Sequence, residues 1–216
     1  MFDKSYSDYY DFLNYDKDYK SEIEMIYKMA GKPKRILDVG CGTAFYWKYL
    51  PEGIQVCGIE KSINMILKSN YAGHIAHGDV LKQPNLEGYS KFDLVTALFD
   101  VMNYLPRHDW WYRLPLKKGG YFIFDIFDKR KVDRDGFLET RRNANGVERR
   151  IIPGNYDGRA VNLKILLHGD DWVETEIHKL YIYSQKEIET FAQGNFEIVK
   201  TLETSKWQTW YIIRKK

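Results

Sequence analysis

The chain has 216 residues, a formal net charge of +3 and two cysteines, which suits one domain with a sizeable core rather than two independent domains. The small charge does not indicate a nucleic-acid binder, and we find neither an apolar run long enough to cross a bilayer nor a secretory signal at the N-terminus. Cys41 and Cys57 lack Cys or His partners at metal-ligand spacing, so we expect no metal, no disulfide and a cytoplasmic protein.

The first part of the chain alternates short apolar segments with segments that suit helices. A Tyr-rich lead runs into a helix expected over 19–30, which Gly31 ends. Strands are expected over 35–39, 55–59, 74–77, 92–98 and 121–127, and helices over 45–50, 62–69 and 109–116. This alternation predicts an α/β fold with a mostly parallel sheet that helices cover on both faces.

After Asp128 the pattern changes to strands alone. They are expected over 137–142, 147–152, 160–168 and 172–183, joined by the turn signals Asn145-Gly146, Pro153-Gly154 and Asp157-Gly158. We therefore expect an antiparallel β insertion after the fifth strand.

Ser184 and Glu187 form a capping-box pattern and predict the start of a helix. Strands over 195–202 and 209–214 are expected to close the chain. The single domain 1–216 then consists of an N-terminal lid and helix (1–30), a core (31–128), the insertion (129–183), and a final helix and hairpin (184–216).

The segment 36–44 reads Ile-Leu-Asp-Val-Gly-Cys-Gly-Thr-Ala, a buried strand that runs into a glycine turn and a helix. Small residues at 40, 42 and 44 let a ligand approach the backbone, and helix N-terminal amides can hold a negative group. Glu60 ends the next expected strand, where an acidic residue in such folds binds a ribose diol. A nucleoside pocket is therefore predicted, although the glycines alone can make a tight turn and Glu60 can cap a helix.

Phe45 stands where dinucleotide-binding proteins have a third glycine, and its side chain would obstruct a pyrophosphate. This argues against NAD as the ligand of the pocket.

The sequence Leu37-Asp38-Val39-Gly40-Cys41-Gly42-Thr43 resembles the first motif of class I S-adenosylmethionine-dependent methyltransferases, and the later strands follow in matching order over nearly the whole chain. The resemblance implies a Rossmann-like, mostly parallel seven-stranded sheet and S-adenosyl-L-methionine as cofactor. It places the methionine part at the glycine turn, the ribose at Glu60 and the adenine amino group at Asp79. Ala44 departs from the third glycine of the motif. The expected cofactor-binding residues are Tyr10, Tyr19, Asp38, Gly40, Cys41, Gly42, Glu60, Lys61, Met65, Asp79, Val80, Leu98 and Phe99.

The segments 10–13, 17–19 and 98–105, and the surroundings of His178, resemble amino-sugar N,N-dimethyltransferases and similar small-molecule enzymes. This narrower resemblance implies that Tyr10 and Tyr19 close as a lid over the carboxylate and amine of the cofactor. Alternatively, the two tyrosines anchor the N-terminal helix to the core.

Methyl transfer is an in-line displacement, so an enzyme mainly aligns donor and acceptor and, where necessary, removes a proton. Ligands of open α/β sheets bind beyond the carboxyl ends of the strands, which places the acceptor near 99–104 and 125–128. We expect Tyr104 and Asp100 to orient the acceptor or take its proton, and Asn103, Asp125 and His178 to bind it. Structural roles, such as helix capping by Asp100 and core packing by Tyr104, explain the same positions.

The insertion is expected to cover the acceptor site, and its basic side chains can attract a phosphorylated or acidic acceptor or form an ordinary solvated surface. These side chains are Lys129, Arg130, Lys131, Arg134, Arg141, Arg142, Arg149 and Arg150. The expected function is methylation of N or O of a small molecule such as an amino sugar or glycan precursor. An RNA or protein methyltransferase and a non-catalytic nucleoside-binding protein are the alternatives; no Asn/Asp-Pro-Pro-Tyr-like motif follows the fourth strand.

Overall fold

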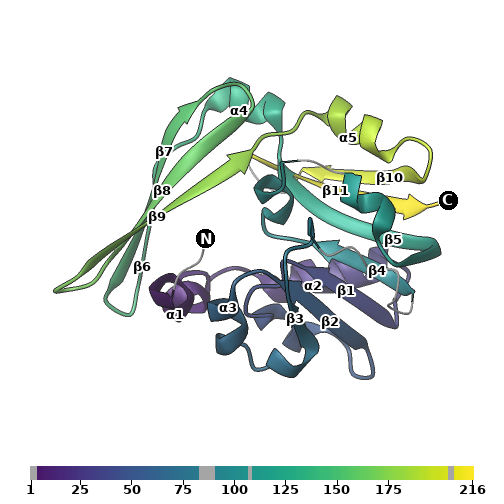
Figure 1. Ribbon diagram of the computed structural model, residues 1–216, viewed down its shortest axis with the longest axis horizontal. Coiled ribbons are helices and arrows are strands. Elements are labelled where there is room, and N and C mark those ends of the chain that lie inside the picture. The colour runs from purple at the N-terminus through teal and green to yellow at the C-terminus, as the bar shows by residue number, and fades with distance from the viewer. Residues whose placement is uncertain (1–3, 83–90, 107–108, 204–206) are drawn as a thin grey trace.

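The computed structural model describes residues 4–82, 91–106, 109–203 and 207–216. A seven-stranded sheet has the strand order β10-β11-β5-β4-β1-β2-β3 (Figure 1). Its strands are β1 (Arg35–Val39), β2 (Gln55–Glu60), β3 (Ile75–His77), β4 (Phe92–Ala97), β5 (Leu116–Phe127), β10 (Phe196–Glu203) and β11 (Gln208–Lys215). The pairs among β1 to β5 are parallel, whereas β11 is antiparallel to β5 and β10. The predicted mostly parallel seven-stranded sheet is confirmed.

Alternate residues of the central strands face opposite layers of the core. Leu94 packs in a cluster with α2 (Tyr19–Met29), α3 (Ile63–Lys68) and the 3₁₀ helix η1 (Phe45–Tyr49). Its neighbour Val95 packs in the cluster that contains Trp111 of η5 and Ile188 of α5. The 3₁₀ helices η2, η4 and η5 span Ala72–His74, Val101–Tyr104 and Asp109–Arg113, and α5 spans Gln185–Ala192. Helices therefore cover both faces of the sheet, as predicted from the alternation of short apolar strands with helices.

A second sheet contains β6 (Thr140–Ala144), β7 (Val147–Tyr156), β8 (Ala160–His168) and β9 (Val173–Tyr181), all antiparallel to their neighbours. Figure 1 shows this sheet as a long curved blade that reaches past the edge of the core. The helix α1 (Lys4–Leu13) lies against it, because Tyr6 and Leu13 share an apolar cluster with Val147 and Ile165. The N-terminal segment thus joins the antiparallel sheet to the core.

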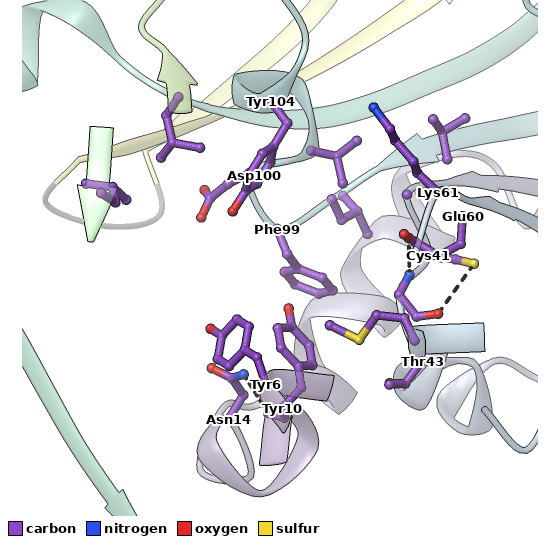
Figure 2. A pocket seen from close by; sticks show the side chains of 18 of the residues that line it. Tyr6, Tyr10, Asn14, Cys41, Thr43, Glu60, Lys61, Phe99, Asp100 and Tyr104 are labelled. Atoms are coloured by element: carbon purple, nitrogen blue, oxygen red, sulfur yellow. Dashed lines mark hydrogen bonds between the residues drawn. The ribbon is translucent and has the colours of Figure 1, made fainter. Parts of the chain in front are cut away.

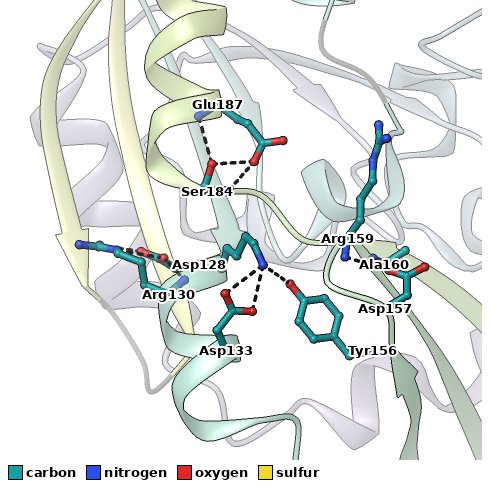
Figure 3. A network of polar contacts seen from close by, with 10 residues as sticks. Asp128, Arg130, Asp133, Tyr156, Asp157, Arg159, Ala160, Ser184 and Glu187 are labelled. Atoms are coloured by element: carbon teal, nitrogen blue, oxygen red, sulfur yellow. Dashed lines mark hydrogen bonds and ion pairs between the residues drawn. The ribbon is translucent and has the colours of Figure 1, made fainter.

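The structure contains the predicted helix cap at Ser184 and the predicted hairpin turn at Asn145-Gly146. The Ser184 hydroxyl accepts from the backbone N–H of Glu187 at 3.3 Å, and the Glu187 carboxylate accepts from the Ser184 backbone N–H at 2.8 Å (Figure 3). Asn145 and Gly146, between β6 and β7, both have positive φ angles of 50° and 76°, as a two-residue type I′ hairpin turn requires. The capping box and this hairpin are therefore confirmed.

Three expected elements differ from those observed. A helix, α4 (Lys129–Asp135), precedes the second sheet, so the strand expected over 137–142 begins only at Thr140. The helix expected over 109–116 is shortened, because β5 already begins at Leu116. The segment Pro153-Gly154 is not a turn: β7 continues through it with an irregularity in its pairing to β8.

Glycine at 154 has a packing reason, since a Cβ there would lie 2.9 Å from the carbonyl oxygen of Asn162. Within the described ranges, the chain contains no helix with the length and apolar character that spanning a membrane requires.

Candidate active site

A cavity of about 390 Å³ opens at the carboxyl ends of β1, β2 and β4. Its walls come from this edge of the main sheet, from α1, and from β7, β8 and β9 of the antiparallel sheet. Figure 2 shows Glu60 and Lys61 on one side and Asp100 and Tyr104 on another, with Tyr10 facing them from α1. Segments far apart in the sequence therefore meet around one space.

The glycine turn after β1 makes one wall of the cavity. Gly40 has a φ of +68°, and a Cβ at this position would lie 2.6 Å from Cγ2 of Val101. Gly42 has a φ of +57°, and a Cβ there would meet no atom within 4 Å. Gly40 is thus required by conformation and by a close neighbour, whereas Gly42 leaves its backbone open to the cavity.

Ala44, where the resembling family has a third glycine, also has a left-handed φ of 56° and is fully buried. Glycine adopts this region at no steric cost, whereas alanine is strained there. The family's glycine at this position is therefore explained by backbone conformation, and Ala44 keeps the same turn.

Glu60 connects the glycine turn to the end of β2. Its Oε2 accepts from the backbone N–H of Gly42 at 2.9 Å, and its Oε1 accepts from that of Ser62 at 2.7 Å. The side chain is 7% exposed, and burial raises the pKa of its carboxyl. Because a carboxylate has about four acceptor positions, Glu60 can hold both amides and still accept hydrogen bonds from a ligand.

The next strand end adds a second acidic side chain. Asp79 accepts from Lys61 Nζ at 2.9 Å and from the backbone N–H of Leu81 at 3.0 Å. Asp79, Lys61, Val80 and Met65, which were expected to bind the cofactor, all line the cavity. The expected cofactor-binding residues Cys41 and Leu98 line it too.

Asp38 does not line the cavity, although it was expected to bind the cofactor. It is 1% exposed and accepts hydrogen bonds from Tyr46 Oη, from Trp47 Nε1 at 2.7 Å and from Thr96 Oγ1 at 2.8 Å. Burial raises its pKa to about 6, although these hydrogen bonds act in the opposite direction. Asp38 instead fixes η1 beneath the glycine turn.

The N-terminal tyrosines Tyr10 and Tyr19 both line the cavity. Tyr19 makes edge contacts with the rings of Phe45 and Phe99, at centroid distances of 5.7 and 5.4 Å. Tyr10 lies on α1, which is tied to the glycine turn because Thr43 Oγ1 donates to Asp11 at 2.7 Å. Tyr19 therefore packs against aromatic residues of the cavity wall, and Asp11 holds α1 at the glycine turn.

A strained turn follows β4. Phe99 and Asp100 have consecutive positive φ angles of 64° and 68°, a conformation that bulky residues rarely adopt and that often marks a functional site. The backbone N–H of Asp100 donates to Asp125 at 3.0 Å, and Gln208 Nε2 donates to the Asp100 carboxylate at 2.5 Å. These contacts hold Asp100 at the cavity wall, while Asp125 lies behind it in the core.

The two carboxyl groups influence each other. Burial raises the pKa of Asp100, and burial together with the charge of Asp100 raises the pKa of Asp125 well above its usual value. Two neighbouring carboxyl groups do not ionise independently. Asp125 therefore takes up a proton first, and Asp100 is the member that presents a negative charge to the cavity.

A chain of hydrogen bonds leads from the cavity into the antiparallel sheet. Tyr104 Oη lies 2.8 Å from Nδ1 of His178, whose Nε2 lies 2.6 Å from Oε2 of Glu176. Tyr104 lines the cavity, whereas His178 and Glu176 are buried behind it on β9. Because an ionised carboxylate only accepts, Nε2 of His178 carries the proton and Nδ1 accepts from the tyrosine.

Asn103 lies behind the wall as well. Its Nδ2 donates to the carbonyl oxygen of Tyr181 at 2.6 Å and its Oδ1 accepts from the backbone N–H of Phe127 at 3.0 Å. The side chain thus links η4 to β9 and β5. Of the three expected substrate-binding residues, Asn103, Asp125 and His178, none lines the cavity, and each supports a residue or element that does.

Residues 37–124, which include the glycine turn and Glu60, match the family model described as a methyltransferase domain. This part of the chain is therefore similar to a methyltransferase domain. A protein of Geobacillus sp. (strain WCH70), named as a candidate methyltransferase, is 31% identical over 147 residues, which are 60% of this chain and 59% of that protein. The matched region thus spans less than two thirds of that relative.

Solved structures share the fold of this chain over nearly its whole length. An S-adenosylmethionine-dependent methyltransferase of Clostridium acetobutylicum ATCC 824 has a TM-score of 0.77 at 20% identity and 98% coverage of both chains. An amino pentose methyltransferase of Micromonospora echinaspora gives 0.73 at 17% identity, with 100% of this chain and 98% of that chain covered. A sugar N-methyltransferase of Streptoalloteichus sp ATCC 53650 gives 0.73 at 18% identity, with 94% and 90% covered. The fold is that of the class I methyltransferases.

Two polar residues at or behind this cavity were not singled out in the sequence analysis. Glu176 alternates with His178 on the buried face of β9, and a polar residue at an inward position of a strand is the signal that identifies it. Arg149 was one of eight basic residues in the insertion, yet it is buried and lines the cavity. Within the described ranges, no cluster of three or more His, Cys, Asp or Glu side chains is placed to hold a metal ion.

Proposed function

We propose that this chain transfers the methyl group of S-adenosylmethionine to nitrogen or oxygen of a small molecule. The observation that carries the proposal is the hydrogen bond between Gly42 and Glu60, which places an open glycine turn and a buried carboxylate on one cavity wall. Tyr104 and Asp100 lie on another wall of the same cavity. The arrangement suits a donor and an acceptor held side by side.

The residues present fit the proposed cofactor. Glu60 has acceptor positions left for a ribose diol, and Asp79 offers a carboxylate to the adenine amino group. The open backbone at Gly42 suits the methionine part, with Tyr10 and Tyr19 covering it from the N-terminal helices. When bound, S-adenosylmethionine supplies a methyl group on a positively charged sulfur.

Tyr104 then handles the proton of the acceptor. Burial raises the pKa of Tyr104 well above its usual value, so the phenol is protonated at neutral pH and is no base by itself. Its oxygen can take a proton from the acceptor as its own proton passes to Nδ1 of His178. Glu176 accepts from the other ring nitrogen and stabilises the imidazolium that results.

Asp100 orients the acceptor. Its carboxylate is the ionised member of the pair with Asp125, and Gln208 and the main chain fix its position. A carboxylate at the cavity wall attracts an amine or accepts from a hydroxyl. An amine is the better match, because an amine acceptor is cationic until it loses the proton that Tyr104 is placed to receive.

The acceptor class we propose is an amino sugar or a related glycan precursor. The amino pentose and sugar N-methyltransferases among the structural neighbours support it. Because both sheets build the cavity, we also propose that 1–216 acts as one domain.

A labelled-methyl assay tests the function. The full chain is incubated with methyl-labelled S-adenosylmethionine and separate pools of amino sugars, neutral sugars, simple amines, RNA and protein. We expect label in the amino-sugar pool. Label in RNA or protein alone would overturn the acceptor class, and binding of S-adenosylhomocysteine without transfer to any pool would overturn the enzymatic role.

A further inference from the structure

Arg149 of β7 is a buried cation that faces the cavity. Its side chain is 8% exposed and lines the same space as Glu60 and Tyr104. Its Nη1 donates to Tyr6 Oη at 3.2 Å and to Asn14 Oδ1 at 3.3 Å. Its Nε is buried and has no hydrogen-bond partner.

The other basic residues in the first part of the insertion, 129–150, differ from Arg149 in one respect. Each of the seven has a carboxylate partner, as Arg130 has in Asp128 (Figure 3). They are Lys129, Arg130, Lys131, Arg134, Arg141, Arg142 and Arg150. Among the residues that the structure describes, no carboxylate forms an ion pair with Arg149. Of these eight described basic residues, Arg149 is thus the one without an ion pair, and its side chain faces the ligand space.

A buried guanidinium without a counter-charge is costly. Arginine stays protonated in proteins, and a charge removed from water is destabilising unless it is paired. Tyr6 and Asn14 are neutral, so they orient the guanidinium without neutralising it. The hydrogen bonds to Tyr6 and Asn14 use Nη1 alone, and the planar guanidinium can bind a carboxylate or phosphate through two parallel hydrogen bonds.

The position of Arg149 assigns this anion to the acceptor rather than to the cofactor. Arg149 belongs to the antiparallel sheet, and its partner Tyr6 has its ring 6.1 Å from that of His178 in the Tyr104 chain. The glycine turn and Glu60 belong to the main sheet on another side of the cavity. Arg149 therefore lies beside the groups proposed to handle the acceptor.

We propose that Arg149 binds an anionic group of the methyl acceptor, so that the substrate is a small molecule with a carboxylate, phosphate or sulfate ester. The proposal rests on the function proposed above. It narrows that function to acidic acceptors and makes Tyr6 and Asn14 positioning residues for the guanidinium.

Inorganic phosphate serves as the probe. The full chain is first saturated with S-adenosylhomocysteine and then titrated calorimetrically with phosphate. We expect a single site with a dissociation constant on the order of 1 mM, weakened at least about tenfold in Arg149→Met and less in Arg149→Lys, which keeps the charge but loses the fork. Arg150→Met changes the half-buried and ion-paired neighbour on the same strand, which does not line the cavity; it is the matched control and leaves phosphate binding unchanged.

The outcomes separate the possible errors. No phosphate binding up to about 20 mM, or equal binding by Arg149→Met, overturns the anion site. A loss of S-adenosylhomocysteine affinity in Arg149→Met, with Arg149→Lys and Arg150→Met intact, assigns the arginine to the carboxylate of the cofactor instead. Failure of the wild-type chain to bind S-adenosylhomocysteine at all is a failure of the proposed function and not of this site alone.

Discussion

The backbone N–H of Gly42 donates to Oε2 of Glu60 at 2.9 Å, which joins the ends of two neighbouring parallel strands. The contact is made by a backbone that no side chain covers and a carboxylate that is almost fully buried. In a parallel sheet all carboxyl ends meet at one edge. The wall proposed to bind the cofactor therefore forms because β1 and β2 are parallel neighbours and because the glycine turn follows β1.

Gly40→Ala should damage this wall through two separable effects. The new Cβ would meet Val101 at 2.6 Å and would occupy a φ of +68°, so we expect a loss of about 2 kcal/mol or more in the free energy of unfolding. Gly53 has a φ of +79° with no atom within 4 Å of a new Cβ, so Gly53→Ala measures conformational strain alone, about 1 kcal/mol.

Val101→Ala in the Gly40→Ala background should restore the unfolding free energy that is lost to the clash. The loss that comes from the positive φ should remain. Urea unfolding of the four proteins measures both. Equal costs for Gly40→Ala and Gly53→Ala would show that Val101 does not limit this turn.

Tyr104→Phe should lower kcat by about 100-fold, because the proton of the acceptor loses its path to His178. The affinity for S-adenosylhomocysteine should stay within about threefold, since Tyr104 lies on the acceptor side. His178→Gln should have a similar effect, and the double variant should be little worse than either single one, because both residues serve one path. Additive losses in the double variant would mean that the two residues act separately.

Asp38→Asn should change the pH dependence of stability. Burial raises the pKa of Asp38 to about 6 in the folded chain, above about 3.9 in the unfolded chain. The neutral form is favoured on folding, so this contribution is full below pH 4 and is lost as the pH rises through 6. A shift of about two pKa units corresponds to roughly 3 kcal/mol.

The measurement is the difference in unfolding free energy between wild type and Asp38→Asn from pH 4 to pH 7. Wild type should lose stability relative to the variant over this range. A difference that stays constant, or that grows in favour of wild type, would contradict the assigned burial of an Asp38 carboxyl with a raised pKa.

Elements with a complete local signal could be predicted from the sequence. A few neighbouring residues determine each of three such features: the apolar strand β1, the capping box of Ser184 and Glu187, and the Asn145-Gly146 turn. The helix α4 was not predicted, because Val132 is its one apolar residue and a single apolar residue gives no hydrophobic periodicity. Pro153-Gly154 signals a turn locally, but pairing of β7 with β8 overrides it.

Part of the candidate site could likewise be predicted from the sequence, and part of it could not. The glycine turn and Glu60 follow from spacing along two adjacent strands, and both line the cavity. Asp38 belongs to the same motif, yet a motif does not say to which side a strand residue points, and Asp38 points beneath the turn. The Tyr104 to His178 contact joins residues 74 positions apart, and only the packing of two sheets brings them together.

Calorimetric titration of the full chain with S-adenosylhomocysteine tests the central claim most directly, that Glu60 and the glycine turn hold the adenosyl group. Wild type should bind one equivalent, and Glu60→Ala should bind it more weakly by about 1 to 3 kcal/mol through the loss of charged hydrogen bonds. Glu52→Ala, at an exposed position before β2, should bind as wild type does. Absence of binding by wild type, or an unchanged affinity in a folded Glu60→Ala variant, would contradict the account.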